Sequence, residues 1–244
     1  MHAFRFDDLA SAEPGSSFRL DSREEAHLFR ILRARPGETV AVMDGHGTLG
    51  TAMVEADHQL KLETRYTVPP PARRLHLFFA PPKKQKLDVL LKQAVELGVY
   101  ELVPVLCERS VVQPGENSVA GRWMDLLFEA CKQSGNPFLP EVANPMPFAA
   151  ALARARETCG ALVVGSNRTG VSIELDAASD IAFFVGPEGG FTDAETDAMF
   201  AAGAVPLRIG ADWHCHASYE TKSINLFALD KPTVKEVLDE SNRR

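Results

Sequence analysis

The sequence predicts an α/β protein of two domains: a small β-rich N-terminal domain and a larger domain built on a parallel sheet. Residues 1–67 contain short apolar segments separated by turns. Residues 68–72 read Val-Pro-Pro-Pro-Ala, a proline run that favours a stiff, extended linker. Beyond it, apolar strands alternate with amphipathic helices, which is typical of a parallel sheet covered on both faces. We therefore expect domains over residues 1–69 and 73–244.

One helix and one strand are the clearest elements before the linker. Ser22-Arg23-Glu24-Glu25 has the spacing of a capping box, and Leu28, Ile31 and Leu32 follow at helical spacing. The pattern predicts a capped helix that buries these three side chains. The elements expected next are a turn at 35–38, a strand at 39–43 and a turn at 44–47.

The second domain begins with a buried strand at 75–80 and an amphipathic helix at 86–97 that ends before Gly98. A strand at 102–107 contains Pro104, so we expect it to be broken there. The further helices expected are 122–133, 148–157, 192–202, 220–229 and a polar one after Pro232. The further strands expected are 161–165, 181–186 and 204–209.

Composition excludes several classes of protein. No run of about 20 apolar residues is present, so no membrane span is expected. The first residues lack the apolar stretch of a signal peptide, and the four cysteines form no C-x-x-C pair, which together favour the reducing cytoplasm. The net charge of −7 argues against a general nucleic-acid coat protein. A local cluster of cations can still bind RNA phosphates, because such contacts are short-ranged.

The most informative loop follows the strand Ile181–Val185 and reads Gly186-Pro187-Glu188-Gly189-Gly190. A helix with a Thr192/Glu195 capping box comes directly after it. Ligands of open α/β sheets bind beyond the carboxyl ends of strands, and glycines allow the backbone to approach them closely. Glu188 argues against a phosphate ligand and suits a neutral or cationic one. Spacing alone leaves a plain strand-to-helix turn as the alternative.

Several motifs occur in order along nearly the whole chain. They are His27–Arg33 with Gly37-Glu38, Asp44–Gly47, Lys92–Val99, Pro104 with Arg109-Ser110, Arg122-Trp123 with Glu129–Ser134 and Pro140, and Gly186–Phe191 with Glu195. Each is weak alone. As an ordered set they resemble the family of bacterial 16S rRNA uridine-N3 methyltransferases (the RsmE family), within the SPOUT class of knotted methyltransferases.

The resemblance implies a PUA-like β-barrel at the N-terminus, a SPOUT domain with a deep trefoil knot, and a cytoplasmic homodimer. It also implies that S-adenosylmethionine (SAM) binds to three loops, mainly through their backbone atoms. The cofactor-binding residues implied here are Gly165, Ser166, Gly186, Pro187, Glu188, Gly189, Gly190, Ile209, Gly210 and Thr221.

The third of these loops departs from the family pattern. The family runs from Leu-Gly through a short Ile-Leu-Arg stretch into Glu-Thr-Ala, whereas residues 211–219 replace that stretch with a segment about three residues longer. Glu220-Thr221 is retained. Asn136 also stands where many relatives carry arginine. These changes affect residues that the resemblance implies for SAM binding, RNA binding and catalysis.

Methylation of uridine N3 requires removal of its proton, and the candidate bases are His214, His216 and Glu220. The alternative for each histidine is an ordinary surface or core residue. No metal is expected, because the His214-x-His216 pair with Cys215 has no second ligand cluster at zinc spacing. The candidate RNA-binding residues are Arg30, Arg33, Lys86, Arg109, Lys132 and Asn136; their alternative is a solvated charged face.

Our leading hypothesis is SAM-dependent methylation of N3 of a specific uridine in the 16S rRNA of the small ribosomal subunit. The altered third loop keeps two alternatives open: a SPOUT methyltransferase with another RNA target, and a non-catalytic RNA-binding relative. A dinucleotide oxidoreductase would need a G-x-G-x-x-G turn after an early strand, which the sequence lacks.

Overall fold

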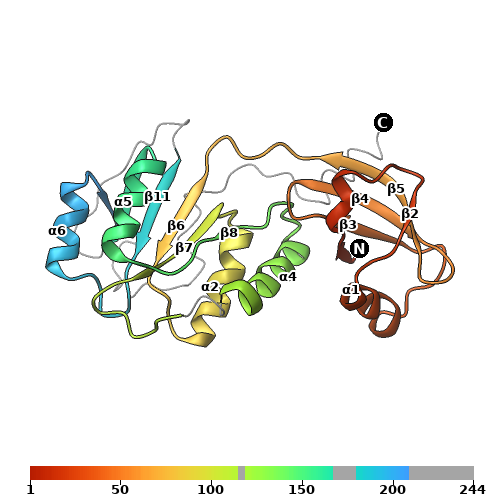
Figure 1. Ribbon diagram of the computed structural model, residues 1–244, viewed down its shortest axis with the longest axis horizontal. Coiled ribbons are helices and arrows are strands. Elements are labelled where there is room, and N and C mark those ends of the chain that lie inside the picture. Colours follow the sequence, from red (N-terminus) through yellow and green to blue (C-terminus); the bar gives the residue numbers. More distant parts are fainter. Residues whose placement is uncertain (115–118, 167–179, 209–244) are drawn as a thin grey trace. The chain divides into compact units, whose positions relative to one another are not determined.

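The computed structural model describes residues 1–114, 119–166 and 180–208 (Figure 1). The chain divides into two compact units, and the first break falls between Pro70 and Pro71, inside the proline run. The first unit contains Met1–Pro70 and also Phe128–Leu139. The second contains Pro71–Leu127 and the described part of Pro140–Asp230. A short stretch from the middle of the chain therefore completes the N-terminal unit.

The first unit is built on a five-stranded mixed sheet, in the order β1-β3-β4-β5-β2. Its strands are β1 (Ala3–Arg5), β2 (Ser17–Phe18), β3 (Thr39–Met43), β4 (Thr48–Val54) and β5 (Leu60–Thr67), and a 3-10 helix, η1 (Asp7–Ala10), follows β1. β1 runs parallel to β3, and the remaining pairs are antiparallel. Phe4, Leu9, Val42 and Leu60 lie in its core, each at most 1% exposed. The predicted β-rich domain is confirmed.

The predicted N-terminal helix is present but differs in its cap and in its buried face. α1 (Ser22–Ala26) begins after Asp21, whose carboxylate accepts from the amides of Arg23 and Glu24, so the cap lies one residue before the predicted serine. The helix continues as a π-helix, η2 (His27–Ile31). Because the wider turn breaks the 3.6-residue period, Ile31 is 71% exposed, against 1% for Leu28. The prediction that Ile31 is buried was wrong.

The second unit contains a seven-stranded sheet in the order β12-β10-β11-β6-β7-β8, with β9 also paired to β7. The strands are β6 (Leu75–Phe79), β7 (Glu101–Leu106), β8 (Glu141–Val142), β9 (Met146–Pro147), β10 (Ala161–Ser166), β11 (Ile181–Val185) and β12 (Val205–Arg208). Its helices are α2 (Lys84–Glu96), η3 (Val119–Trp123), α5 (Phe148–Thr158) and α6 (Asp193–Ala201). A further helix, α4 (Met124–Ser134), begins in this unit and ends in the first. Every pairing is parallel, as predicted.

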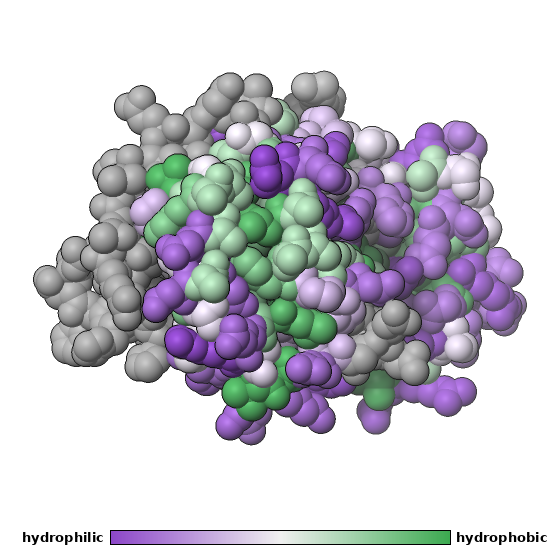
Figure 2. All heavy atoms as spheres, turned by 60° about the vertical axis from the view of Figure 1, so that its left-hand side comes forward, coloured by the Kyte–Doolittle hydropathy of each residue, from purple (hydrophilic) through white to green (hydrophobic). Residues whose placement is uncertain are grey.

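Alternate residues of the central strands cover the two faces of this sheet. Phe78 and Phe184 stack on each other and share a core with Ala151 of α5 and Met199 of α6. Phe79, which points to the opposite face, lies 6.3 Å from the Trp123 ring. Side chains on both faces of the sheet are therefore buried, which leaves its strand ends accessible to ligands. On the face of the molecule drawn in Figure 2, hydrophobic residues lie among hydrophilic ones.

Pro104 does not break β7, contrary to the prediction. It pairs with Phe79 of β6, and the strand continues to Leu106. On its other side β7 pairs with β8 at residues 101–102 and with β9 at 105–106. Residues 103–104 lie between these two short pairings, so the missing N–H of proline interrupts neither of them. The helices expected at 220–229 and after Pro232, and the expected knot, lie outside the described residues.

Candidate functional site

The carboxyl ends of the parallel strands bring the predicted ligand-binding segments to one edge of the sheet. β10 ends at Ser166, beside β11, which ends at Val185 and leads into the loop 186–190. β12 pairs with β10 on its other side and ends at Arg208. Gly165 and Ser166 therefore lie at the end of β10, between β11, which leads into the 186–190 loop, and β12, whose last described residue is Arg208. This is the edge at which open α/β sheets bind their ligands.

The 186–190 loop is a tight turn fixed at both ends. Val185 accepts a hydrogen bond from the amide of Ala80 at 2.9 Å, and Pro187 accepts one from the amide of Gly190 at 2.8 Å. Gly190 has φ 71°, in the left-handed region where glycine is favoured. A Cβ on Gly186 would lie 3.0 Å from the Phe191 ring, closer than real Cβ atoms normally come. The backbone conformation thus favours glycine at 190, and a side chain at 186 would have to displace the Phe191 ring by a few tenths of an ångström.

Arg109, in the segment after β7, holds this loop from outside. Its Nη1 donates to the carbonyl oxygen of Gly189 at 3.0 Å and to that of Phe191 at 3.4 Å. The arginine stem also lies 3.6 Å from the position of a Cβ on Gly189. The segment is itself a turn, since Cys107 and Ser110 exchange hydrogen bonds. Arg109 therefore has a positioning contact with the loop that sequence reasoning assigned to SAM.

Glu195 makes a second connection between the same two segments. Its carboxylate is buried and accepts from the amide of Glu108 at 2.9 Å and from the amide of Thr192 at 2.8 Å. The Thr192 hydroxyl accepts in return from the Glu195 amide, so the predicted capping box is confirmed. Burial, and secondarily the Glu195 charge, raises the pKa of the Cys107 thiol to about 12. One carboxylate thus caps α6 and fixes the segment after β7.

The chemistry of this edge fits a ligand such as SAM. The 186–190 loop offers backbone groups and one exposed carboxylate, Glu188, and contains no cation. A Cβ on Gly190 would have no neighbour within 4 Å, so space for a ligand adjoins the backbone. An exposed carboxylate disfavours a phosphate and attracts a sulfonium cation. Gly165, Ser166 and the residues from Gly186 to Gly190 are therefore suitably placed.

The proposed RNA-binding residues differ in their surroundings. Arg30 and Arg33 are exposed at the end of η2, and Lys86 is exposed in the first turn of α2. Lys132 is not exposed: its side chain retains 4% of its accessible area, and its ammonium lies 2.8 Å from Glu24 and 2.7 Å from Glu129. Burial and two ion pairs give Lys132 a structural role, so it is not carried into the RNA-binding proposal.

Asn136 is likewise buried and hydrogen-bonded inside the first unit. It is 7% exposed, and its side-chain oxygen accepts from the amide of Phe138 at 3.1 Å. The segment 136–139 packs against the turn after β3, where Leu139 donates to the carbonyl oxygen of Gly45 at 2.8 Å. A buried amide with this contact shapes a turn, so Asn136 is not carried into the RNA-binding proposal either.

The remaining predicted site residues lie outside the described part of the chain. They are the candidate bases His214, His216 and Glu220 and the cofactor-binding candidates Ile209, Gly210 and Thr221. Among the described residues, no group of three or more potential metal ligands is present. None of the helices described is long and apolar enough to cross a bilayer.

Sequence reasoning missed the coupling of Glu195 to residue 108 and the ion pairs of Lys132. The capping-box spacing was visible, yet it identifies only one of the two segments that Glu195 contacts. Lys132 was predicted to bind RNA, and one of its two ion-pair partners, Glu24, is 108 residues away in the sequence. No local pattern signals such a pair.

Comparisons with known proteins agree with this geometry. The chain matches the family model of the RNA methyltransferase domain over residues 69–212 and that of the RNA methyltransferase PUA domain over residues 20–64. It is 31% identical to a protein of Synechocystis sp. named ribosomal RNA small subunit methyltransferase E, over 75% of this chain and 63% of that protein. The protein of the same name from Mycobacterium tuberculosis is 28% identical, over 81% of this chain and 80% of that protein.

Solved structures show the same fold. The crystal structure of a ribosomal RNA small subunit methyltransferase E from Neisseria gonorrhoeae, bound to S-adenosylmethionine, superposes with a TM-score of 0.78 at 26% identity and covers 90% of this chain and 93% of that chain. A probable rRNA methyltransferase from Porphyromonas gingivalis superposes with a TM-score of 0.73 at 22% identity over 90% of this chain and 94% of that one.

Proposed function

Because the chain belongs to the RNA methyltransferase family, we propose that it methylates N3 of a specific uridine in the 16S rRNA of the small ribosomal subunit, with SAM as the methyl donor. The observation that carries the proposal is the 186–190 loop, a glycine turn with an exposed Glu188 at the carboxyl edge of a parallel sheet. Arg109 and Glu195 hold this loop in place. The relative with 26% identity is bound to SAM.

The chain is built as a PUA domain followed by a SPOUT-type α/β domain. We assign RNA binding to residues 1–69 and methyl transfer to residues 73–244. We propose that three exposed cations contact RNA phosphates: Arg30 and Arg33 in the first domain and Lys86 in the second. Such contacts supply affinity but do not distinguish one base sequence from another. Arg109 contributes mainly by holding the loop.

SAM supplies an electrophilic methyl group on a positively charged sulfur. Backbone groups of Gly165, Ser166 and the 186–190 loop would hold the cofactor, and the Glu188 carboxylate would favour its positive charge. Transfer of the methyl group from sulfur to uridine N3 would release the N3 proton to a base of the chain. Glu220, His214 and His216 are the candidates for that base. Ile209, Gly210 and Thr221 complete the proposed cofactor site.

The test is methyl transfer from labelled SAM to 30S subunits and to naked 16S rRNA, both from cells that lack the corresponding gene. Label in one nucleotide, identified as 3-methyluridine by mass spectrometry of the digested RNA, is the expected result. Comparing the two substrates identifies which one the enzyme uses. Absence of label from both, with SAM binding intact, would contradict the proposal.

The altered segment 211–219 favours one second candidate, a SPOUT methyltransferase with a different RNA target. Repeating the assay with total RNA separates the two, since the second candidate would label a nucleotide outside 16S rRNA. Failure to bind SAM in calorimetry would instead favour a non-catalytic RNA-binding relative.

We further propose a homodimer in which the cofactor site adjoins the partner subunit, as the family resemblance implies. Light scattering on the purified protein should give twice the mass of the 26.6 kDa chain. A substrate in the ribosome also implies that the protein acts in the cytoplasm.

A further inference from the structure

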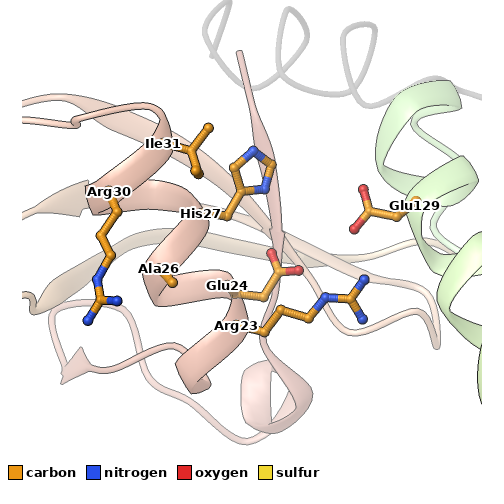
Figure 3. A pocket seen from close by; sticks show the side chains of 7 residues that line it. All are labelled: Arg23, Glu24, Ala26, His27, Arg30, Ile31 and Glu129. Atoms are coloured by element: carbon orange, nitrogen blue, oxygen red, sulfur yellow. The ribbon is translucent and has the colours of Figure 1, made fainter.

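A hollow of about 520 Å³ opens in the first unit between α1, η2 and the part of α4 that belongs to this unit (Figure 3). It is lined by Arg23, Glu24, Ala26, His27, Arg30, Ile31 and Glu129. Its volume is within the roughly 300–1,000 Å³ of typical ligand pockets. None of these residues belongs to the cofactor edge of the second unit, so the hollow needs a separate explanation.

The backbone beside the hollow is irregular in a way that costs free energy. Leu32 donates to the carbonyl oxygen of His27 at 3.0 Å across the π-turn, and Ala34 donates to that of Leu28 at 3.1 Å. Arg33 between them has φ 58°, which is unfavourable for a residue other than glycine. The result is an isoleucine, Ile31, that is 71% exposed beside the hollow. π-Turns are frequent at functional sites, so the surroundings of this one merit a search for a ligand site.

Two acidic residues that line the hollow, Glu24 and Glu129, share one ion-pair partner. The Lys132 ammonium, 4% exposed, lies 2.8 Å from Oε1 of Glu24 and 2.7 Å from Oε1 of Glu129. The other oxygen of Glu24 accepts from the Arg5 amide. Glu129 is different: its side chain is 41% exposed, and Lys132 contacts it through Oε1. Figure 3 shows this carboxylate pointing across the gap toward His27 and Glu24. Glu129 therefore offers a rigid carboxylate with free acceptor capacity.

The walls supply the other groups that a nucleotide requires. Arg30 places an exposed guanidinium group at the rim, where it can meet a phosphate. Ile31 and Ala26 offer an apolar surface for a base. His27 adds an aromatic ring, held edge-on by Phe4 with ring centroids 5.9 Å apart. Single-stranded RNA is recognised by this combination of phosphate contacts, stacking and hydrogen bonds to base edges.

We propose that this hollow binds one guanosine of single-stranded rRNA, with its base against Ile31 and His27 and its Watson–Crick edge on Glu129. A carboxylate only accepts hydrogen bonds. Guanine presents two adjacent donors, N1–H and N2–H, whereas adenine and cytosine place an acceptor beside their amino group, and uracil flanks N3–H with two carbonyl oxygens. Glu129 therefore selects guanine. The proposal deepens the rRNA methyltransferase function and rests on it.

The test measures the affinity of the full-length protein for five-nucleotide RNAs of sequence UUXUU by fluorescence anisotropy. X is guanosine, adenosine, cytidine, uridine or inosine, which lacks the N2 amino group. Guanosine is expected to bind about tenfold more tightly than adenosine, cytidine or uridine, the size of one bidentate base contact. Inosine should fall in between. Equal affinity for all five RNAs would overturn the proposal.

Two variants and one control locate the effect. Glu129→Gln should abolish the preference for guanosine while leaving the affinity for the uridine oligomer unchanged. Ile31→Ser, at an exposed position where folding is not at risk, should weaken binding of every oligomer. Glu38→Gln removes the same charge from an exposed turn outside the hollow and should behave as wild type. A guanosine preference that survives Glu129→Gln would refute the assignment to this site.

The outcome is separable from that of the proposed function. SAM binding by calorimetry and methyl transfer to 30S subunits are measured on the same preparations. Intact transfer with no base preference rejects the guanosine site alone. A guanosine preference without transfer to any RNA supports the site and contradicts the enzymatic proposal.

Discussion

Arg109 donates a hydrogen bond from Nη1 to the carbonyl oxygen of Gly189 at 3.0 Å, which joins the segment after β7 to the loop after β11. The resemblance to known relatives had suggested an RNA contact for Arg109. The contact seen here instead sets the position of a loop proposed to hold SAM. Exposed arginines can do both, so the two roles call for a direct comparison.

Arg109→Ala should weaken SAM binding about three- to tenfold and lower the free energy of unfolding by no more than about 1 kcal/mol. A hydrogen bond of this kind contributes about 1 kcal/mol, and Arg109 is exposed. Calorimetric titration with SAM is the measurement, and Arg156→Ala, which removes an exposed arginine from α5, is the control. If SAM affinity is unchanged and RNA affinity falls, Arg109 is an RNA contact rather than a positioning residue.

Glu195→Ala should lower the free energy of unfolding by about 2 kcal/mol, because it leaves the amides of Glu108 and Thr192 without their acceptor. Glu195→Gln, which keeps one acceptor oxygen, should cost less. Urea unfolding gives both values. Asp193→Asn removes the same charge from an exposed site in the first turn of α6 and should cost about 0.5 kcal/mol. Equal losses for Glu195→Ala and Asp193→Asn would mean that the two contacts contribute nothing specific.

The predictable part of the structure is the part fixed by local chemistry. The Thr192/Glu195 box caps α6 because both partners are three residues apart, and the parallel order follows from alternating strands and helices. Gly186 could be identified as a loop position because it ends an apolar run.

The errors arise where the sequence allows more than one arrangement. Asp21 rather than Ser22 caps α1, since either can accept from the first free amides and the chain path decides between them. Pro104 is accommodated because two separate short strands flank it. Ile31 is exposed because a π-turn replaces the expected α-turn. In each case the sequence pattern alone does not select between the possible arrangements.

Stability should fall on acidification through Glu101, which lies at the amino end of β7. Burial raises the pKa of Glu101, but the hydrogen bond with His76 and the charge of Arg154 outweigh it, and the pKa lies below its ordinary value of 4.5. A depressed carboxyl pKa stabilises the folded state fully above the unfolded value, and this contribution is lost as pH falls through the folded value. The loss is therefore expected below about pH 4.5.

Urea unfolding at a series of pH values between 7 and 3 measures this effect. Glu101→Gln should be less stable than wild type at pH 7, and its stability should decline less on acidification. Glu157→Gln changes an exposed carboxyl on α5 and should give a curve parallel to that of wild type. Parallel curves for Glu101→Gln and wild type would exclude Glu101 as the source of the pH dependence.

Lys132→Ala should be strongly destabilising, by about 3–5 kcal/mol, because it leaves the Glu24 carboxylate, 8% exposed, without its cation. That is a large fraction of the roughly 5–15 kcal/mol that holds a typical domain folded. Lys132→Met keeps the volume of the side chain and should be nearly as harmful, which separates lost charge from lost packing. Urea unfolding gives both values.

The double variant Glu24→Gln/Lys132→Met removes both charges and should recover at least 1 kcal/mol relative to the sum of the single changes, since an uncompensated buried charge costs more than a missing pair. If Lys132 instead contacted an RNA phosphate, the opposite result is expected. Lys132→Met would then fold with normal stability and would bind RNA with a reduced dependence on salt. The 4% exposure of the lysine side chain favours the first outcome, because an ammonium enclosed by two carboxylates has little surface to offer a phosphate.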